Sequence, residues 1–116
     1  MQVFNKTRHQ RLGDNIKIAG NFFTRLIGLL ATAHLPTGAG LLIKPCSSVH
    51  TFGMRYPIDV VFVDSSHTVI KVVSGLRPCR WAVAGGAAYV IELPAGMVRS
   101  TYTQAGDRIE LLSRAL

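Results

Sequence analysis

The sequence predicts an α+β fold that is mainly β: a small barrel-like antiparallel or mixed sheet with one principal helix near residues 22–34. Three observations lead to this class. The chain has 116 residues, 48% hydrophobic and 16% charged, which suits a single folded domain over residues 1–116. Helical spacing of apolar residues occurs before Pro36. From Gly40 onward, short apolar runs alternate with Pro, Gly, Ser and Asp, as in a sandwich or small barrel.

The N-terminal segment has the composition of two short strands, at residues 2–8 and 15–19. The turn-forming pair Gly13 and Asp14 lies between them. We therefore expect these two strands to form an opening hairpin.

The principal helix is predicted next. Asn21 suits a helix N-cap, and Pro36 with the glycine-rich turn after it ends the helix. The apolar residues that recur at helical spacing are Phe22, Phe23, Leu26, Ile27 and Leu30.

The rest of the chain predicts six strands. Each is a short run rich in apolar and β-branched residues, bounded by turn residues. They cover residues 41–44, 48–52, 58–64, 68–73, 87–93 and 108–112.

The formal net charge of +7, from 13 Lys and Arg against 6 Asp and Glu, favours an anionic partner or ligand. The basic residues are scattered, and the only short basic run is Lys6, Arg8 and Arg11. Aromatic residues do not interleave with basic ones as they do in single-strand binders. We therefore expect no specific nucleic-acid partner, and a monomer or weak dimer.

Location is predicted from what the chain lacks. No apolar run reaches the roughly 18–20 residues of a membrane span. The N-terminus does not show the basic, apolar and small-residue order of a secretory signal. A cytoplasmic protein is therefore expected. Cys46 and Cys79 are too few and too far apart for a disulfide framework, so two buried free thiols are expected.

The segment from Pro45 to Asp64 is the most unusual part of the sequence. Cys46, His50, Arg55 and Asp59 stand there in an apolar, strand-rich context. Charged groups are costly among core residues unless they are paired or used. This segment is therefore the candidate site.

Two acids on predicted strands, Asp59 and Glu92, have apolar neighbours on their own faces. A carboxylate in that setting must be paired, hydrogen-bonded or shifted in pKa. One interpretation is structural: Asp59 accepts bonds from turn amides, or pairs with Arg55 or Arg25. The other is functional, with Asp59 and Glu92 at a ligand or acting as acid and base.

A metal site is not expected. Cys46 and His50 have a C-x-x-x-H spacing, but on a strand residues four apart lie ~13 Å apart, too far to chelate one ion. No further ligand cluster completes a four-coordinate site. No cofactor is expected, and a hydrogen-bonded histidine near the core is the preferred interpretation of His50.

Four blocks of the sequence resemble the family called domain of unknown function 192. They are RLIGLL from Arg25, GLLIKPCSSVHTFGMRYPIDVVFVD from Gly40, VIELPAG from Val90 and AGDRIEL from Ala105. The order of these blocks is specific and covers nearly the whole chain after about Asn15. The chain resembles a His-Thr-Phe-Gly-Met-Arg subgroup, since many relatives carry Trp-Met-Lys-Asn-Thr where it has residues 52–56.

The resemblance implies a compact α+β domain with a small barrel-like sheet and no established biochemical function. The recurring polar positions of the family fall here on Arg25, Thr51, Met54, Asp59, Glu92 and Asp107.

The sequence is compatible with three functions. The first is a binding module for a small polar or anionic ligand in a cleft beside Asp59. The second is a hydrolase-type enzyme with Asp59 and Glu92 as acid and base, and the third an accessory protein that docks an acidic partner. The predicted ligand-binding residues are Arg25, His50, Thr51, Met54, Arg55, Asp59 and Glu92.

Overall fold

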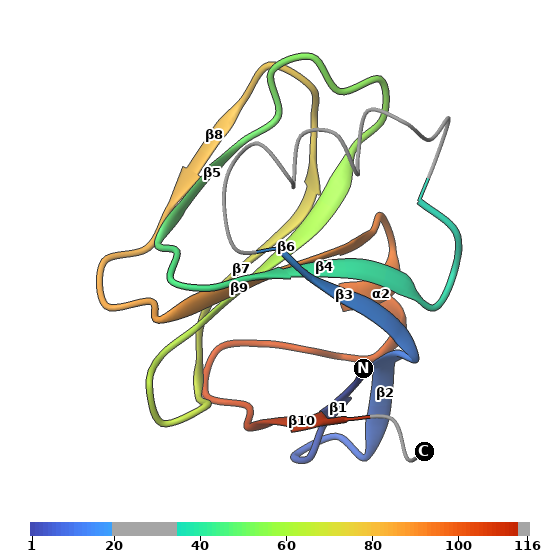
Figure 1. Cartoon of the computed structure of the whole chain (residues 1–116), viewed down its shortest axis with the longest axis vertical. Helices are drawn as coiled ribbons and strands as arrows, with labels where there is room; N and C mark the ends of the chain where they lie inside the picture. The colour runs from blue at the N-terminus through green and yellow to red at the C-terminus, as the bar shows by residue number, and fades with distance from the viewer. Residues whose placement is uncertain (20–34, 114–116) are drawn as a thin grey trace.

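The computed structural model describes residues 1–19 and 35–113 and confirms the α+β, mainly β class (Figure 1). The predicted principal helix near residues 22–34 lies outside these ranges. The strands are β1 Gln2–Asn5, β2 Gln10–Gly13, β3 Asn15–Ala19, β4 Ala39–Ile43, β5 Ser48–His50, β6 Ile58–Val63, β7 Val69–Leu76, β8 Trp81–Val83, β9 Tyr89–Pro94 and β10 Ile109–Leu112. The described helix is α2 Met97–Ser100.

The described strands form three sheets. The central one is a five-stranded mixed sheet in the order β3-β4-β9-β6-β7, where only the β3–β4 pair is parallel. A three-stranded sheet, β10-β1-β2, lies at one end of the molecule, and a two-stranded sheet, β5-β8, lies at the other (Figure 1). The sheets curl, but among the described strands none closes into a barrel.

Both faces of the central sheet are buried. On β6 and β9 nearly every residue is buried, so alternate side chains enter two different cores. One core joins Val60 and Phe62 to Val49 of β5 and Ala82 of β8. The other joins residues such as Val61 to the three-stranded sheet, through Val3, Leu12 and Ile109. The sheet is therefore the middle layer, and any polar side chain on it must find its partners inside the protein.

The prediction that residues 2–8 and 15–19 pair with each other in an opening hairpin is wrong. β1 pairs with β2 across a turn at residues 6–9, whereas β3 pairs parallel with β4. The reason is a local main-chain contact: the N–H groups of Asp14 and Asn15 both donate to the carbonyl oxygen of Gly38, at 3.1 and 2.9 Å. The chain after Gly13 is thereby fixed beside the start of β4. It meets the beginning of the chain at Ile16, which exchanges two main-chain hydrogen bonds of 3.0 Å with Met1.

The six strands predicted after Gly40 are confirmed, with shifted ends. The sequence did not predict β2, β8 or α2, which span four, three and four residues, too few to show a periodic pattern.

Candidate functional site

Asp59 is a fully buried carboxylate in the central sheet. Its Oδ1 accepts a hydrogen bond from the main-chain N–H of Gly75 at 2.8 Å. Its Oδ2 accepts from the N–H groups of Gly96 at 3.1 Å and Val98 at 2.8 Å. Three such bonds compensate the carboxylate for the water it has lost. This arrangement favours the structural interpretation, in which Asp59 accepts bonds from turn amides.

Asp59 also caps the short helix α2. The N-cap of α2 is Gly96, which has no side chain to accept from the first N–H groups of the helix. The carboxylate from β6 takes that place. The position of residues 94–98 is therefore determined by a side chain far away in the sequence.

The two glycines that donate to Asp59 have left-handed backbone conformations, with φ of 66° at Gly75 and 97° at Gly96. A Cβ at either position would meet no atom within 4 Å, so space is not the constraint. Glycine is required there because other residues rarely adopt this conformation.

Glu92 is also fully buried, but it lies on the other face of the sheet. In the antiparallel β6–β9 pair, Asp59 is opposite Leu93, and Val60 is opposite Glu92. Directly opposed residues share a face, so the two acids point into different cores. This geometry does not bring Asp59 and Glu92 together as an acid–base pair on one substrate bond.

Thr51 joins two loops at the β5–β8 end of the molecule. It is fully buried, and its hydroxyl donates to the carbonyl oxygen of Arg77 and accepts from the N–H of Arg80 at 2.9 Å. Its main-chain N–H donates to the carbonyl oxygen of Arg80 at 2.9 Å, and its carbonyl accepts from Cys79 N–H at 3.1 Å. Thr51 therefore fixes residues 77–80 against the end of β5.

We expect Thr51→Val to lower the free energy of unfolding by about 1–3 kcal/mol, because valine keeps the shape but leaves a buried N–H and a carbonyl without the hydroxyl. Urea denaturation measures the change. Ser65→Ala, which removes a hydroxyl from an exposed turn residue, is the control and should change stability by less than about 0.5 kcal/mol. Equal stability of Thr51→Val and wild type would show that the hydroxyl is dispensable.

The other predicted site residues lie in different environments. His50 is half-buried on β5, Met54 is buried in the core beside Val49, and Arg55 is exposed. Arg25 lies outside the described residues. Both cysteines are free, as predicted, but the expectation that both are buried is wrong: Cys46 is half-buried and Cys79 is exposed. The loop after Pro78 turns outward with Cys79 at a φ of 61°.

Two neighbouring pockets lie along residues 94–97, the segment that Asp59 anchors, and Thr37 lines both of them. We call them the polar lobe and the apolar lobe, and the two together the two-lobed cleft. The polar lobe, of about 380 Å³, is lined by Arg11, Gly13, Asp14, Thr37, Gly38 and Met97. The apolar lobe, of about 300 Å³, is lined by Leu35, Thr37, Tyr56, Pro57, Pro94 and Ala95. These sizes lie at the lower end of the range for small-molecule sites.

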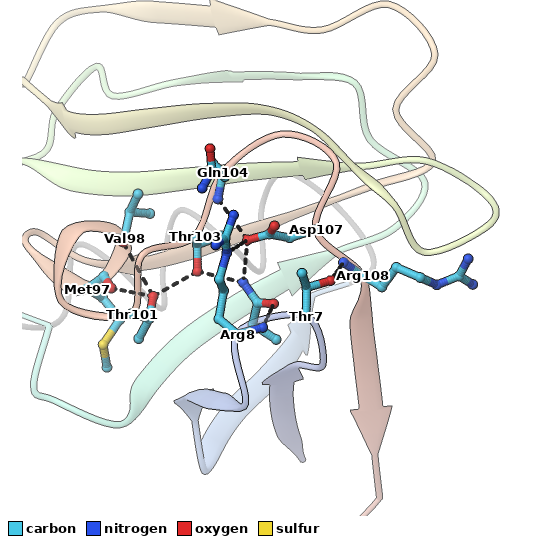
Figure 2. Close-up of polar contacts among 10 residues, drawn as sticks. Thr7, Arg8, Met97, Val98, Thr101, Thr103, Gln104, Asp107 and Arg108 are labelled. Carbon is cyan, nitrogen blue, oxygen red and sulfur yellow. Dashed lines mark hydrogen bonds and ion pairs between the residues drawn. The ribbon is translucent and has the colours of Figure 1, made fainter.

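Asp107 is the centre of a separate buried network (Figure 2). Its Oδ2 accepts from Asn5 Nδ2 at 2.9 Å, from Arg8 Nε at 3.2 Å and from Gln104 N–H at 3.0 Å. Asn5 also donates to the Thr103 hydroxyl at 3.0 Å. The network therefore ties the first strand to the loop before the last strand.

The pKa of the Asp107 carboxyl lies below its usual value. Burial by itself raises this pKa, but the hydrogen bonds from Asn5, Arg8 and Gln104, together with the Arg8 charge, outweigh it. Asp107 is therefore ionised in the folded protein under ordinary conditions.

The short basic run of the sequence is matched by acids in the structure. Lys6 Nζ lies 3.6 Å from a Glu110 carboxylate oxygen. Arg8 pairs with Asp107, and Arg11 lies 3.9 Å from Asp14. Since each residue of the run has an acidic neighbour, the run does not form a patch of uncompensated positive charge.

Sequence reasoning missed the residues that line the polar lobe. Arg11 was noted only as part of the basic run, and Thr37 and Met97 were not singled out. The three come from segments distant in the chain, and a single sequence carries no signal that they meet.

Residues 1–19 and 35–113 contain no group of three or more His, Cys, Asp or Glu side chains placed to share a metal ion. Within the same ranges, no helix has the length and apolar character that a membrane crossing requires.

The fold and the buried polar residues define a class: a small α+β domain whose layered, curled sheets are fixed by buried carboxylates. The chain belongs to the family DUF192, described as Uncharacterized ACR, whose pattern matches residues 3–111. It is 37% identical to a UPF0127 protein of Thermococcus sibiricus, over 93% of this chain and 73% of that protein. It is 33% identical to a UPF0127 protein of Pyrococcus abyssi, over 96% of this chain and 97% of that one.

A solved structure has the same fold. It is a protein of unknown function from Novosphingobium aromaticivorans, with a TM-score of 0.81 and 19% identity over 96% of this chain and 84% of that one. The family is described as uncharacterised and this solved structure as a protein of unknown function, so the function proposed below rests on the geometry of the cleft.

Proposed function

We propose that the protein is a binding module for a small polar ligand with an anionic group, held in the two-lobed cleft. The observation that carries this proposal is the anchoring of the cleft wall. Asp59 accepts from the N–H groups of Gly96 and Val98, on either side of Met97, which lines the polar lobe. A wall fixed in this way costs little ordering entropy when a ligand binds.

The lining residues suggest how the ligand lies. Arg11 can donate to an anionic group of the ligand in the polar lobe, where Asp14 lies 3.9 Å from it, and Thr37 supplies a hydroxyl to both lobes. Asp14 beside Arg11 suits a donor group on the same ligand. Tyr56 and the prolines of the apolar lobe suit a less polar part. A ligand with a charged end and an apolar end therefore fits both lobes.

The site residues predicted from the sequence enter this proposal in two ways. Asp59 acts by positioning the wall, and the loop that carries Thr51, Met54 and Arg55 continues into Tyr56 and Pro57 of the apolar lobe. An acid–base role for Asp59 and Glu92 is not proposed, because the two carboxylates occupy opposite faces of the sheet.

Native mass spectrometry on gently purified protein tests the proposal. We expect a small molecule bound to wild type and lost in Arg11→Gln. Removing a charge-assisted hydrogen bond to an anionic group weakens affinity about tenfold or more. Lys17→Gln, which removes one exposed charge from β3, should retain the ligand. Equal ligand occupancy in Arg11→Gln and wild type, or an unliganded mass for all three proteins, would contradict the proposal.

A further inference from the structure

A patch of exposed apolar side chains covers the outer face of the two-stranded β5–β8 sheet. Trp81 is 61% exposed, Val83 55% and Phe52 42%; we call these three residues the Trp81 patch. Val49 and Ala82 of the same strands point inward to the core, so the patch is the opposite, outward face. Large apolar side chains gathered in this way mark an interaction surface.

The rings of the patch are packed together. The centroids of Phe52 and Trp81 lie 5.3 Å apart at an interplanar angle of 85°, and the His50 ring lies 5.1 and 5.4 Å from them. Interlocked rings do not offer the flat, parallel platform on which successive nucleotide bases stack. They form a compact apolar projection, and Val83 extends it with an aliphatic side chain.

Basic side chains surround the Trp81 patch. Arg80 directly precedes Trp81, and Lys71 Nζ donates to the carbonyl oxygen of Val83 at 2.8 Å. Arg77 is held next to Phe52 because its carbonyl oxygen accepts the hydroxyl hydrogen bond of Thr51. Arg55 follows Phe52 by three residues, and all four of these basic side chains are exposed.

Acidic side chains are absent from the segments that build this end. Residues 44–58 and 65–91 contain five Lys and Arg and no Asp or Glu. Of the acids next to these segments in the chain, Asp59 and Glu92 are fully buried, and Asp64 is half-buried in the β6–β7 turn, where it accepts hydrogen bonds from Ser66 and Thr68. The three acids that pair with the N-terminal basic run belong to the other end. The charge around the Trp81 patch is therefore positive and uncompensated by those segments.

We propose that the Trp81 patch docks the protein on an anionic lipid surface. Tryptophan and phenylalanine settle at the boundary between headgroups and acyl chains, and each nearby Lys or Arg adds attraction to acidic headgroups. The residues that line the cleft of the proposed function are not part of the Trp81 patch. This role is additional to ligand binding.

The test uses intrinsic fluorescence, because Trp81 is the one tryptophan of the chain. Vesicles of equal phosphatidylglycerol and phosphatidylcholine should shift Trp81 emission to the blue and sediment the protein, and vesicles of phosphatidylcholine should bind at least tenfold more weakly. Binding to the anionic vesicles should weaken as the salt concentration rises.

Variants separate charge from apolar insertion. Arg77→Gln combined with Arg80→Gln should weaken sedimentation with anionic vesicles about tenfold or more, and Phe52→Ala should weaken it without changing the salt dependence. Lys17→Gln combined with Arg99→Gln removes two exposed charges elsewhere and should bind as wild type. Equal binding of the Arg77 and Arg80 double variant and wild type would overturn the proposal.

Two soluble polyanions serve as competing partners. Oligothymidylate and polyglutamate at the same charge concentration should leave Trp81 emission unchanged. A shift or quench with either one as large as that with anionic vesicles would replace the lipid surface by a single-stranded nucleic acid or an acidic peptide.

Discussion

Replacing Asp59 by alanine is expected to lower the free energy of unfolding by about 3–5 kcal/mol, because three main-chain N–H groups, one of them on the buried residue Val98, lose their acceptor together and a fully buried side chain is removed. The donors are Gly75, Gly96 and Val98, which belong to two different segments of the chain. Asp59→Asn should lose less, about 2–3 kcal/mol, since the amide keeps one acceptor oxygen but turns an NH₂ group towards a donor. Urea denaturation followed by circular dichroism measures both.

Asp14→Asn is the matched control for Asp59, because it makes the same change at an exposed carboxylate. It should alter stability by no more than about 1 kcal/mol. If Asp59→Ala were as stable as wild type, the carboxylate would not be anchoring residues 94–98, and the functional interpretation of Asp59 would gain support.

The second large effect is expected at Asp107. Asp107→Asn should cost about 2–3 kcal/mol at pH 7, because the Arg8 guanidinium loses its charged partner and the Gln104 N–H loses a carboxylate acceptor. Glu110→Gln, which weakens a largely exposed pair with Lys6, should cost less than about 1 kcal/mol.

The Asp107 effect should depend on pH in a defined direction. The pKa of this carboxyl is lowered in the folded state relative to its usual 3.8, so its contribution is fully present above 3.8 and is lost as the pH falls through the folded pKa. The difference in unfolding free energy between wild type and Asp107→Asn should therefore shrink in acid. A difference that stays constant from pH 7 down to about pH 2 would contradict this assignment.

Short apolar runs bounded by turn residues made most of the strands predictable. The runs at residues 58–64 and 87–93 are apolar on both faces, and both became central strands with two buried faces. The same runs made Asp59 and Glu92 conspicuous, and both are fully buried. Burial of these acids could be predicted because the neighbours of each acid on its own face of the strand are apolar, and a face that buries those neighbours also buries the acid.

The relation between the two acids could not be predicted. It depends on the register of β6 and β9, and a shift of one residue would have placed Asp59 opposite Glu92 on one face. The cleft was hidden for a related reason: Arg11, Thr37 and Met97 meet only through tertiary structure. The first hairpin was wrong because one carbonyl, that of Gly38, holds the chain after Gly13.

Amide hydrogen exchange of Gly75, Gly96 and Val98 tests most directly whether Asp59 anchors the cleft wall. NMR should show these three N–H groups exchanging slowly in wild type and much faster in Asp59→Asn, while the amides of Val61 and Ile91 in the central sheet stay protected in both proteins. If Gly96 and Val98 exchange at the same rate in both proteins, the wall is held by something else and the account of Asp59 is wrong.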